Sequence, residues 1–104
     1  MENNAQWFAR RLTQLRMQKD ISARDMSLSL GQSESYINKI ENGKALPSMT
    51  VFFYICDFLD ITPQEFFAQD ITAPQEFRRF TKECGRLTPQ QLEHLMALIR
   101  DMRG

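Results

Sequence analysis

The chain has 104 residues, of which 42% are hydrophobic and 25% charged, and its thirteen basic residues balance thirteen acidic ones. This is the composition of one small globular domain, with or without an appendage, and it excludes a disordered tail, a collagen-like fibre and a coiled-coil rod. The longest unbroken apolar run, Val51 to Cys56, is far shorter than the roughly 20 residues of a membrane-spanning helix. Residues 1–4 show no basic-then-apolar pattern. We therefore expect a soluble, cytoplasmic protein with no secretory signal and no membrane span.

The charge is distributed unevenly along the chain. Residues 1–47 carry seven Lys or Arg against five Asp or Glu, a net charge of +2, whereas residues 48–104 carry six against eight, a net charge of −2. This mild asymmetry permits a nucleic-acid surface on the first part of the chain, although a strongly basic domain would indicate one far more clearly.

Few residues suit metal binding or catalysis. Cys56 and Cys84 cannot form a disulfide framework and lack the paired spacing of a zinc site. We expect the first in the core and the second partly exposed. His94, the only histidine, is expected at the surface of a helix, and nothing in the sequence suggests a nucleophile beside it. With four scattered glycines and no phosphate-binding loop, the sequence predicts a protein that is not an enzyme and holds no metal or cofactor.

Segments of helical periodicity follow one another along the chain, which predicts an all-α fold. Seven helices are expected, starting at Asn3 or Asn4, Ser22, Ser33, Pro47-Ser48, Thr62, Pro74 and Thr88. The first ends near Lys19, the second stops at Gly31, whose missing Cβ permits a tight turn, and Gly43 follows the third. Thr62-Pro63-Gln64-Glu65 and Thr88-Pro89-Gln90-Gln91 each combine a cap, a proline at the first helical position and a capping-box partner.

Apolar residues at spacings of three and four predict the core. In the first five helices they are Phe8, Leu12, Leu15, Met26, Leu30, Ile37, Ile40, Val51, Phe52, Ile55, Cys56, Leu59 and Phe66. The aromatic cluster of Phe52, Phe53 and Tyr54 is expected to serve the core and a dimer contact and not a ligand pocket. Because the character of the sequence changes after Asp70, we expect one domain over residues 1–70 and a helical extension over residues 71–104.

The second and third helices, joined by a turn at Gly31, form a helix-turn-helix layout. The residues around that turn are Ile21-Ser22, Met26, Leu30 to Lys44 and Pro47-Ser48, and the most specific piece is Tyr36-Ile37-Asn38-Lys39-Ile40-Glu41-Asn42-Gly43-Lys44. This stretch resembles the lambda-repressor-like, or Cro/CI/XRE-type, DNA-binding domain. The resemblance covers roughly residues 6–68 and implies a five-helix helix-turn-helix domain, here followed by two additional C-terminal helices.

A recognition helix presents its N-terminal side chains to base edges in the major groove. Since Ile37 and Ile40 are expected to face the core, the other positions of the third helix and its flanks remain for DNA. The resemblance implies base readers at Glu34, Ser35 and Lys39 and backbone contacts at Asn42 and Lys44, and often at Gln32 or Ser33. Further candidates for DNA contact are Arg24, Tyr36 and Asn38.

Three positions depart from the family pattern or oppose DNA binding. Ala23 stands where the family usually has a phosphate-contacting Gln. Ser27 replaces a small Ala, and its hydroxyl can bond back to a carbonyl of its own helix. Glu34 is acidic at the tip of the reading helix, so weak nonspecific binding is expected.

The resemblance also implies a structural ion pair between Arg16 and Glu41.

The seventh helix carries an apolar stripe that predicts a homodimer. Its residues are Leu92, Leu95, Met96, Ile99 and Met102, with Leu98 widening the stripe. The alternative is that this helix covers the fourth and fifth helices of its own chain. A two-fold dimer reads half-sites about 34 Å apart in a near-palindrome.

We therefore predict a sequence-specific DNA-binding transcriptional regulator, a repressor that binds double-stranded DNA at a palindromic operator as a homodimer. Two alternatives stay open. An antitoxin would use the sixth and seventh helices to bind a toxin partner. A protein-interaction module without DNA affinity is favoured by Ala23, Glu34 and the zero net charge.

Overall fold

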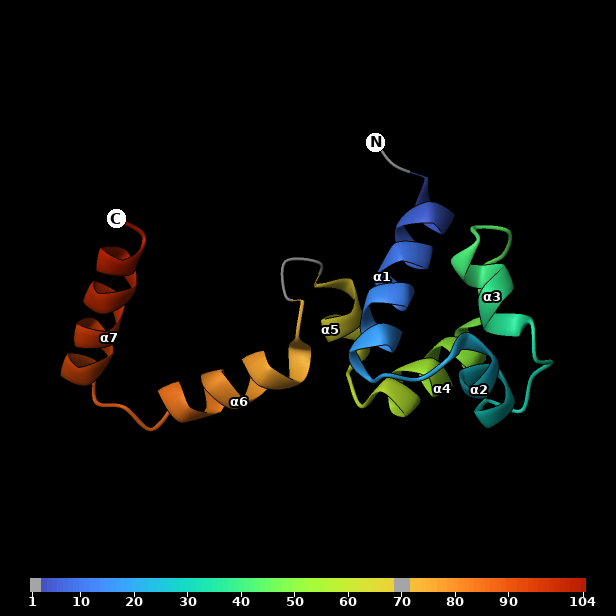
Figure 1. Ribbon diagram of the computed structural model, residues 1–104. Helices are drawn as coiled ribbons and strands as arrows, with labels where there is room; N and C mark the ends of the chain where they lie inside the picture. The colour runs from blue at the N-terminus through green and yellow to red at the C-terminus, as the bar shows by residue number, and fades with distance from the viewer. Residues whose placement is uncertain (1–2, 69–71) are drawn as a thin grey trace. The chain divides into compact units, whose positions relative to one another are not determined.

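The computed structural model describes residues 3–68 and 72–104 (Figure 1), and the predicted domain boundary at residues 70 and 71 lies outside this range. The chain divides into two compact units, Met1–Pro74 and Gln75–Gly104. The helices are α1 (Asn4–Gln18), α2 (Ala23–Ser29), α3 (Tyr36–Glu41), α4 (Met49–Leu59), α5 (Pro63–Phe67), α6 (Pro74–Cys84) and α7 (Pro89–Met102). The described residues are all-helical, which confirms the predicted fold class, and none of their helices is long and apolar enough to cross a membrane.

Most helices of the first unit begin with a predicted side-chain cap. The caps of α1, α2 and α4 are Asn3, Ser22 and Ser48, whose side chains accept hydrogen bonds from the amides of Ala5, Asp25 and Val51. At α5, Thr62 and Glu65 form the full capping box, with Pro63 at the start of the helix between them. Each cap satisfies an amide that has no partner inside its helix and contributes about 1 kcal/mol.

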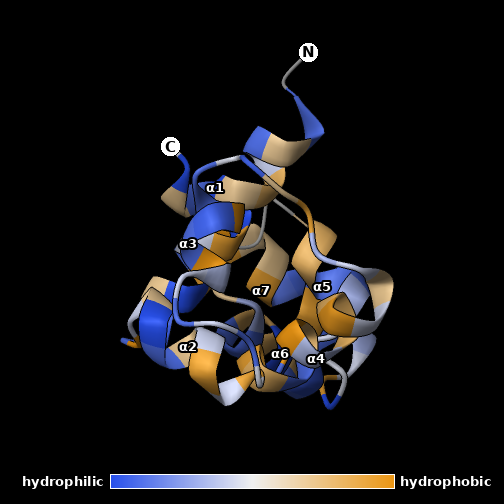
Figure 2. Cartoon of the chain, turned by 90° about the vertical axis from the view of Figure 1, so that its right-hand side faces the viewer, coloured by the Kyte–Doolittle hydropathy of each residue, from blue (hydrophilic) through white to orange (hydrophobic). Residues whose placement is uncertain are grey.

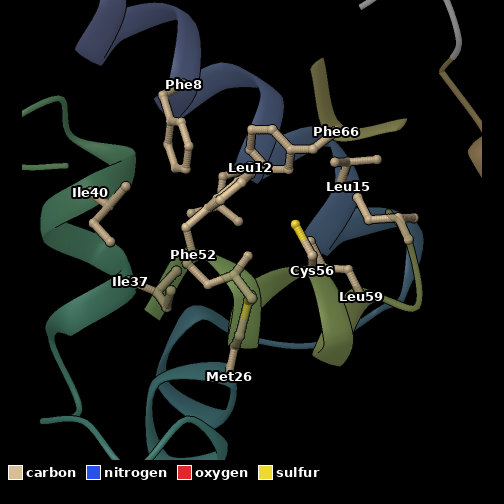
Figure 3. Packing of buried hydrophobic residues seen from close by; sticks show 12 residues of the cluster. Phe8, Leu12, Leu15, Met26, Ile37, Ile40, Phe52, Cys56, Leu59 and Phe66 are labelled. Atoms are coloured by element: carbon tan, nitrogen blue, oxygen red, sulfur yellow. The ribbon is translucent and has the colours of Figure 1, made fainter. Parts of the chain in front are cut away.

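The five helices of the first unit pack around one hydrophobic core (Figure 3). The core residues are Phe8, Leu12 and Leu15 of α1, Met26 of α2, Ile37 and Ile40 of α3, Phe52, Ile55, Cys56 and Leu59 of α4, and Ile61 and Phe66. The ring of Phe66 lies at centroid distances of 4.7 Å from Phe8 and 5.2 Å from Phe52. The predicted core is confirmed except at four positions. Leu30 and Val51 are only partly buried and pack against it, and Phe53 and Tyr54 are 47% and 54% exposed.

The two cysteines differ in exposure as predicted. Cys56 is buried and Cys84 is half-buried. Burial, together with the charge of the Asp57 carboxylate, raises the pKa of the Cys56 thiol to about 11. Cys56 therefore stays neutral at physiological pH and packs as a small apolar side chain. The expectation that His94 lies at the surface is also confirmed.

A buried arginine fastens α5 to α1. Arg11 is only 4% exposed, and its Nε donates a hydrogen bond to the carbonyl of Phe66 at 2.7 Å. Its Nη2 donates to the carbonyls of Glu65 at 2.8 Å and Ala68 at 3.1 Å, while Nη1 donates to Gln14 Oε1 at 2.7 Å. The last carbonyls of a helix lack partners within it, and a cation there is favourable. Arg11 thus closes the C-terminus of α5.

The second unit, taken by itself, consists of α7 and all of α6 beyond its first residue. α7 begins with the predicted capping box between Thr88 and Gln91. In α6 the rings of Phe77 and Phe80 lie 6.4 Å apart and are each nearly half exposed. The predicted stripe of α7 is open to solvent in this unit: Leu92, Met96, Leu98 and Met102 are exposed, and Leu95 and Ile99 are half-buried.

Candidate nucleic-acid interface

The turn between α2 and α3 is set by a glycine in the left-handed conformation. Gly31 has a φ of +73°. Its amide donates to the carbonyl of Leu28, and the amide of Gln32 donates to the carbonyl of Ser27, both at 3.0 Å. This pair of bonds is the Schellman motif, in which a residue with a Cβ would be strained at the glycine position. The tight turn predicted at Gly31 is confirmed.

α3 receives its cap from α2. The prediction that Ser33 caps the third helix is wrong: the N-cap is Ser35, which makes no side-chain cap bond. Residues 34 and 35 form a turn, and this turn puts Ser33 outside the first turn of the helix. The buried hydroxyl of Ser27 accepts from the amide of Ile37 at 2.9 Å and donates to the carbonyl of Ala23 at 2.7 Å. The predicted bond within α2 is confirmed, and the same hydroxyl also caps α3.

Two isoleucines orient α3 in the unit. Ile37 and Ile40 are 0% and 1% exposed, and α3 packs against α1 and α2, with both hydrophilic and hydrophobic residues along it (Figure 2). The predicted interface residues lie on and around this helix, and all of them except Tyr36 are outside the core cluster and the side chains packed on it. The exposed ones are Arg24, Ser33, Glu34, Asn38, Lys39, Asn42 and Lys44, and the half-buried ones are Gln32, Ser35 and Tyr36.

Tyr36 differs from the other candidates because part of its side chain packs against the core. Burial raises the pKa of its hydroxyl above the ordinary value of 10.0. The hydroxyl therefore stays protonated at neutral pH and can donate a hydrogen bond.

α1 and α3 are joined by the predicted ion pair. Arg16 Nε donates to Glu41 Oε2 at 2.7 Å and Nη2 donates to Oε1 at 2.9 Å. The two side chains are only 16% and 9% exposed, and Arg16 Nη1 also donates to the carbonyl of Ile21 at 2.7 Å. The hydrogen bonding to Glu41 raises the pKa of Arg16 and outweighs desolvation, with charge attraction adding to it. Bidentate pairing of this kind fixes geometry, so Glu41 holds α3 at a set position on α1.

A second left-handed glycine ends α3. Gly43 has a φ of +74°, its amide donates to the carbonyl of Ile40, and the amide of Lys44 donates to the carbonyl of Lys39 at 3.1 Å. This is again the Schellman arrangement. It turns the chain away from the helix axis and leaves the side chains of Asn42 and Lys44 exposed beside the end of α3.

The charged side chains of this surface are of two kinds. Arg24 Nε donates to Glu34 Oε2 at 3.1 Å, forming an ion pair between α2 and the turn before α3. Within residues 3–68 and 72–104, neither Lys39 nor Lys44 forms an ion pair. The ammonium groups of both lysines are therefore available to an anionic ligand such as a phosphate.

The sequence did not predict two contacts that position the helices of this unit, those of Ser27 with α3 and of Arg11 with α5. The bond from the Ile37 amide to Ser27 joins residues ten positions apart, and no local pattern indicates it. Arg11 lies between Phe8, Leu12 and Leu15 on the inward face of α1. A charged residue in an apolar stripe was the only available sign of its role.

Comparison with known protein families places this chain among helix-turn-helix proteins. A helix-turn-helix family model matches residues 12–66, just over half of the chain, from the second half of α1 into α5. Neither the curated proteins nor the solved structures gave a match.

Proposed function

The chain belongs to the Cro/CI/XRE-type helix-turn-helix family, and from this we propose that it is a sequence-specific DNA-binding transcriptional regulator. In this proposal it binds a palindromic operator in double-stranded DNA as a homodimer and represses transcription there.

The observation that carries the proposal is the division of α3 into two faces. Ile37 and Ile40 are buried in the core, whereas Asn38 and Lys39 are exposed. A helix of this kind enters the major groove with its N-terminal side chains toward the base edges. The proposed base readers are Glu34, Ser35 and Lys39, with Tyr36 and Asn38 beside them. The proposed phosphate contacts are Arg24, Gln32, Ser33, Asn42 and Lys44.

In the proposal the extension over residues 71–104 supplies the dimer interface. Its main residues are Leu92, Leu95, Met96, Ile99 and Met102 of α7, none of which is buried by the second unit itself. A contiguous apolar surface on a small protein marks an interaction site. Two-fold pairing of two copies matches two half-sites about 34 Å apart, one turn of the double helix.

The experiment is selection of duplexes from a random DNA library by the purified full chain at about 50 mM salt, where phosphate contacts are strong. We expect an inverted repeat with half-sites one helical turn apart. A variant carrying both Lys39→Ala and Lys44→Ala serves as the control and should enrich the repeat far more weakly, with one base position relaxed. If the wild type selects nothing, the DNA-binding proposal fails, and the apolar face of α7 should then be tested in pull-downs against protein partners such as a toxin.

A further inference from the structure

Glu34 poses an electrostatic problem for a DNA-reading surface. The residue is exposed just before α3, and a carboxylate near the double helix is repelled by the phosphates. A glutamate can nevertheless read a base in the major groove by accepting a hydrogen bond from cytosine N4. A cation that offsets the charge of Glu34 would favour this contact.

Arg24 lies in the position of such a cation. Its Nε donates to Glu34 Oε2 at 3.1 Å, and among the described residues this is the single hydrogen bond of either side chain. Glu34 Oε1 therefore remains able to accept from a base. The two terminal nitrogens of the Arg24 guanidinium remain able to donate to a phosphate.

Resting on the proposed DNA-binding function, we propose that Arg24 is the positioning residue for Glu34. It neutralises and holds the carboxylate, so that Oε1 reads a cytosine, while its own terminal N–H groups contact the neighbouring phosphate. Guanine and thymine present acceptors in the major groove at the corresponding place. At such a base the carboxylate oxygen of Glu34 would face another acceptor with no proton between them. Binding to sequences with guanine or thymine at this position would therefore be weaker.

Because Arg24 and Glu34 are exposed, their proposed role in DNA binding can be tested without changing the stability of the fold. The side chains of Arg24 and Glu34 are 65% and 66% exposed, and an exposed ion pair contributes little to folding. Substitutions at either position should therefore leave the thermal unfolding curve of the protein unchanged. Differences in DNA binding between such variants then report the DNA contact itself.

The test is a double-mutant cycle with Arg24→Gln, Glu34→Gln and the double variant. Binding is measured on the duplex selected by the wild type and on one whose cytosine pair is replaced. Arg24→Gln should weaken binding to the selected duplex about tenfold, and about twofold once Glu34 is already Gln or the cytosine is absent. Glu34→Gln should move the selected base from cytosine toward adenine, which Gln reads. Lys44→Gln is the matched control, since it removes a cation that Glu34 does not hold, and should weaken both duplexes equally.

Two results overturn this proposal without affecting the proposed function. One is an equal effect of Arg24→Gln in both backgrounds and on both duplexes. The other is a wild-type motif whose base preferences are unchanged by Glu34→Gln. A wild-type protein that selects no sequence at all would instead remove the proposed function, and the role of this pair with it.

Discussion

Two arginines of α1 hold the first unit together from within. Arg11 donates to three carbonyls at the end of α5, and Arg16 donates through two nitrogens to Glu41 of α3. Burying a charge is costly unless its donors are satisfied. Among the described residues every buried side-chain nitrogen and oxygen has a hydrogen-bond partner. α1 therefore positions both α3 and α5 by polar contacts as well as by apolar packing.

Arg11→Ala should destabilise the first unit by about 3 kcal/mol. The carbonyls of Phe66 and Ala68 lose the donor that Arg11 supplies, the carbonyl of Glu65 keeps only the Ala68 amide, and the core loses a covering side chain. Trp7, the only tryptophan, stacks on Phe67 at 5.6 Å, so its fluorescence during urea unfolding reports this unit. Arg11→Lys keeps the charge but not the fork of donors, and should lose part of the stability. A free energy of unfolding for Arg11→Ala within about 0.5 kcal/mol of the wild type would contradict this role.

The two free lysines of the interface should differ in what they do on DNA. Lys39→Ala should cost about 1–3 kcal/mol on the selected sequence and relax one base position, because its place on α3 suits a base contact. Lys44→Ala should weaken all sequences alike and lower the salt slope by about one, since its proposed contact is with a phosphate. Affinities on matched and mismatched duplexes over a range of salt distinguish the two roles. Equal losses on every sequence for both variants would refute the assignment.

At the scale of the elements, the short helices α2 and α3 depend for their stability on packing against each other and against α1. α3 has six residues, and an isolated helix of that length is not stable in water. Its position depends on the buried face of Ile37 and Ile40, on Glu41 pairing with Arg16, and on the bond from Ser27. The orientation of the proposed DNA-reading surface thus follows from contacts on the opposite side of α3.

Ser27→Ala should test this link between the two helices. The amide of Ile37 is buried without another acceptor once the hydroxyl is removed, so we expect a loss of about 1–2 kcal/mol in the free energy of unfolding. Hydrogen exchange of that amide should also accelerate. Ser29→Ala is the matched control, because Ser29 is exposed on the same helix. Identical unfolding curves for Ser27→Ala and Ser29→Ala would show that the bond does not stabilise the motif.

At the scale of the molecule, the two units differ in how far their apolar residues are covered. The first unit buries a continuous core. The second contains α7, in which no residue is buried, although its stripe of Leu92 to Met102 is strongly apolar. A surface of this kind favours association, and the proposed dimer would cover it.

Ile99→Asp should therefore convert the proposed dimer into a folded monomer. A carboxylate in the middle of the apolar interface would be desolvated without a partner. Light scattering should show the mass falling to that of one 12.2 kDa chain, while circular dichroism keeps the helical signal. Gln90→Asp introduces the same residue at an exposed position of α7 and should leave the mass unchanged. An unaltered dimer mass for Ile99→Asp would place the interface elsewhere.

Local rules were enough for most of the fold. Helix starts at Asn3, Ser22, Ser48 and Thr62 follow from side chains that reach an amide two or three residues on. The buried faces follow from apolar spacing of three and four, and the turn at Gly31 from a missing Cβ. These signals are readable because cause and effect lie within about one helical turn.

The rest depended on residues that meet only after the chain has folded. Ser27 caps a helix that begins nine positions later, Arg11 closes a helix end more than fifty residues away, and Arg24 reaches Glu34 across the turn. The predicted cap at Ser33 was wrong because residues 34 and 35 form a turn ahead of the helix, and the Tyr36 amide donates to the carbonyl of Ser33 instead of to its side chain. A buried polar group forms a hydrogen bond with the donor or acceptor that tertiary packing places beside it. That partner can lie far away in the sequence, so local residue spacing does not predict it.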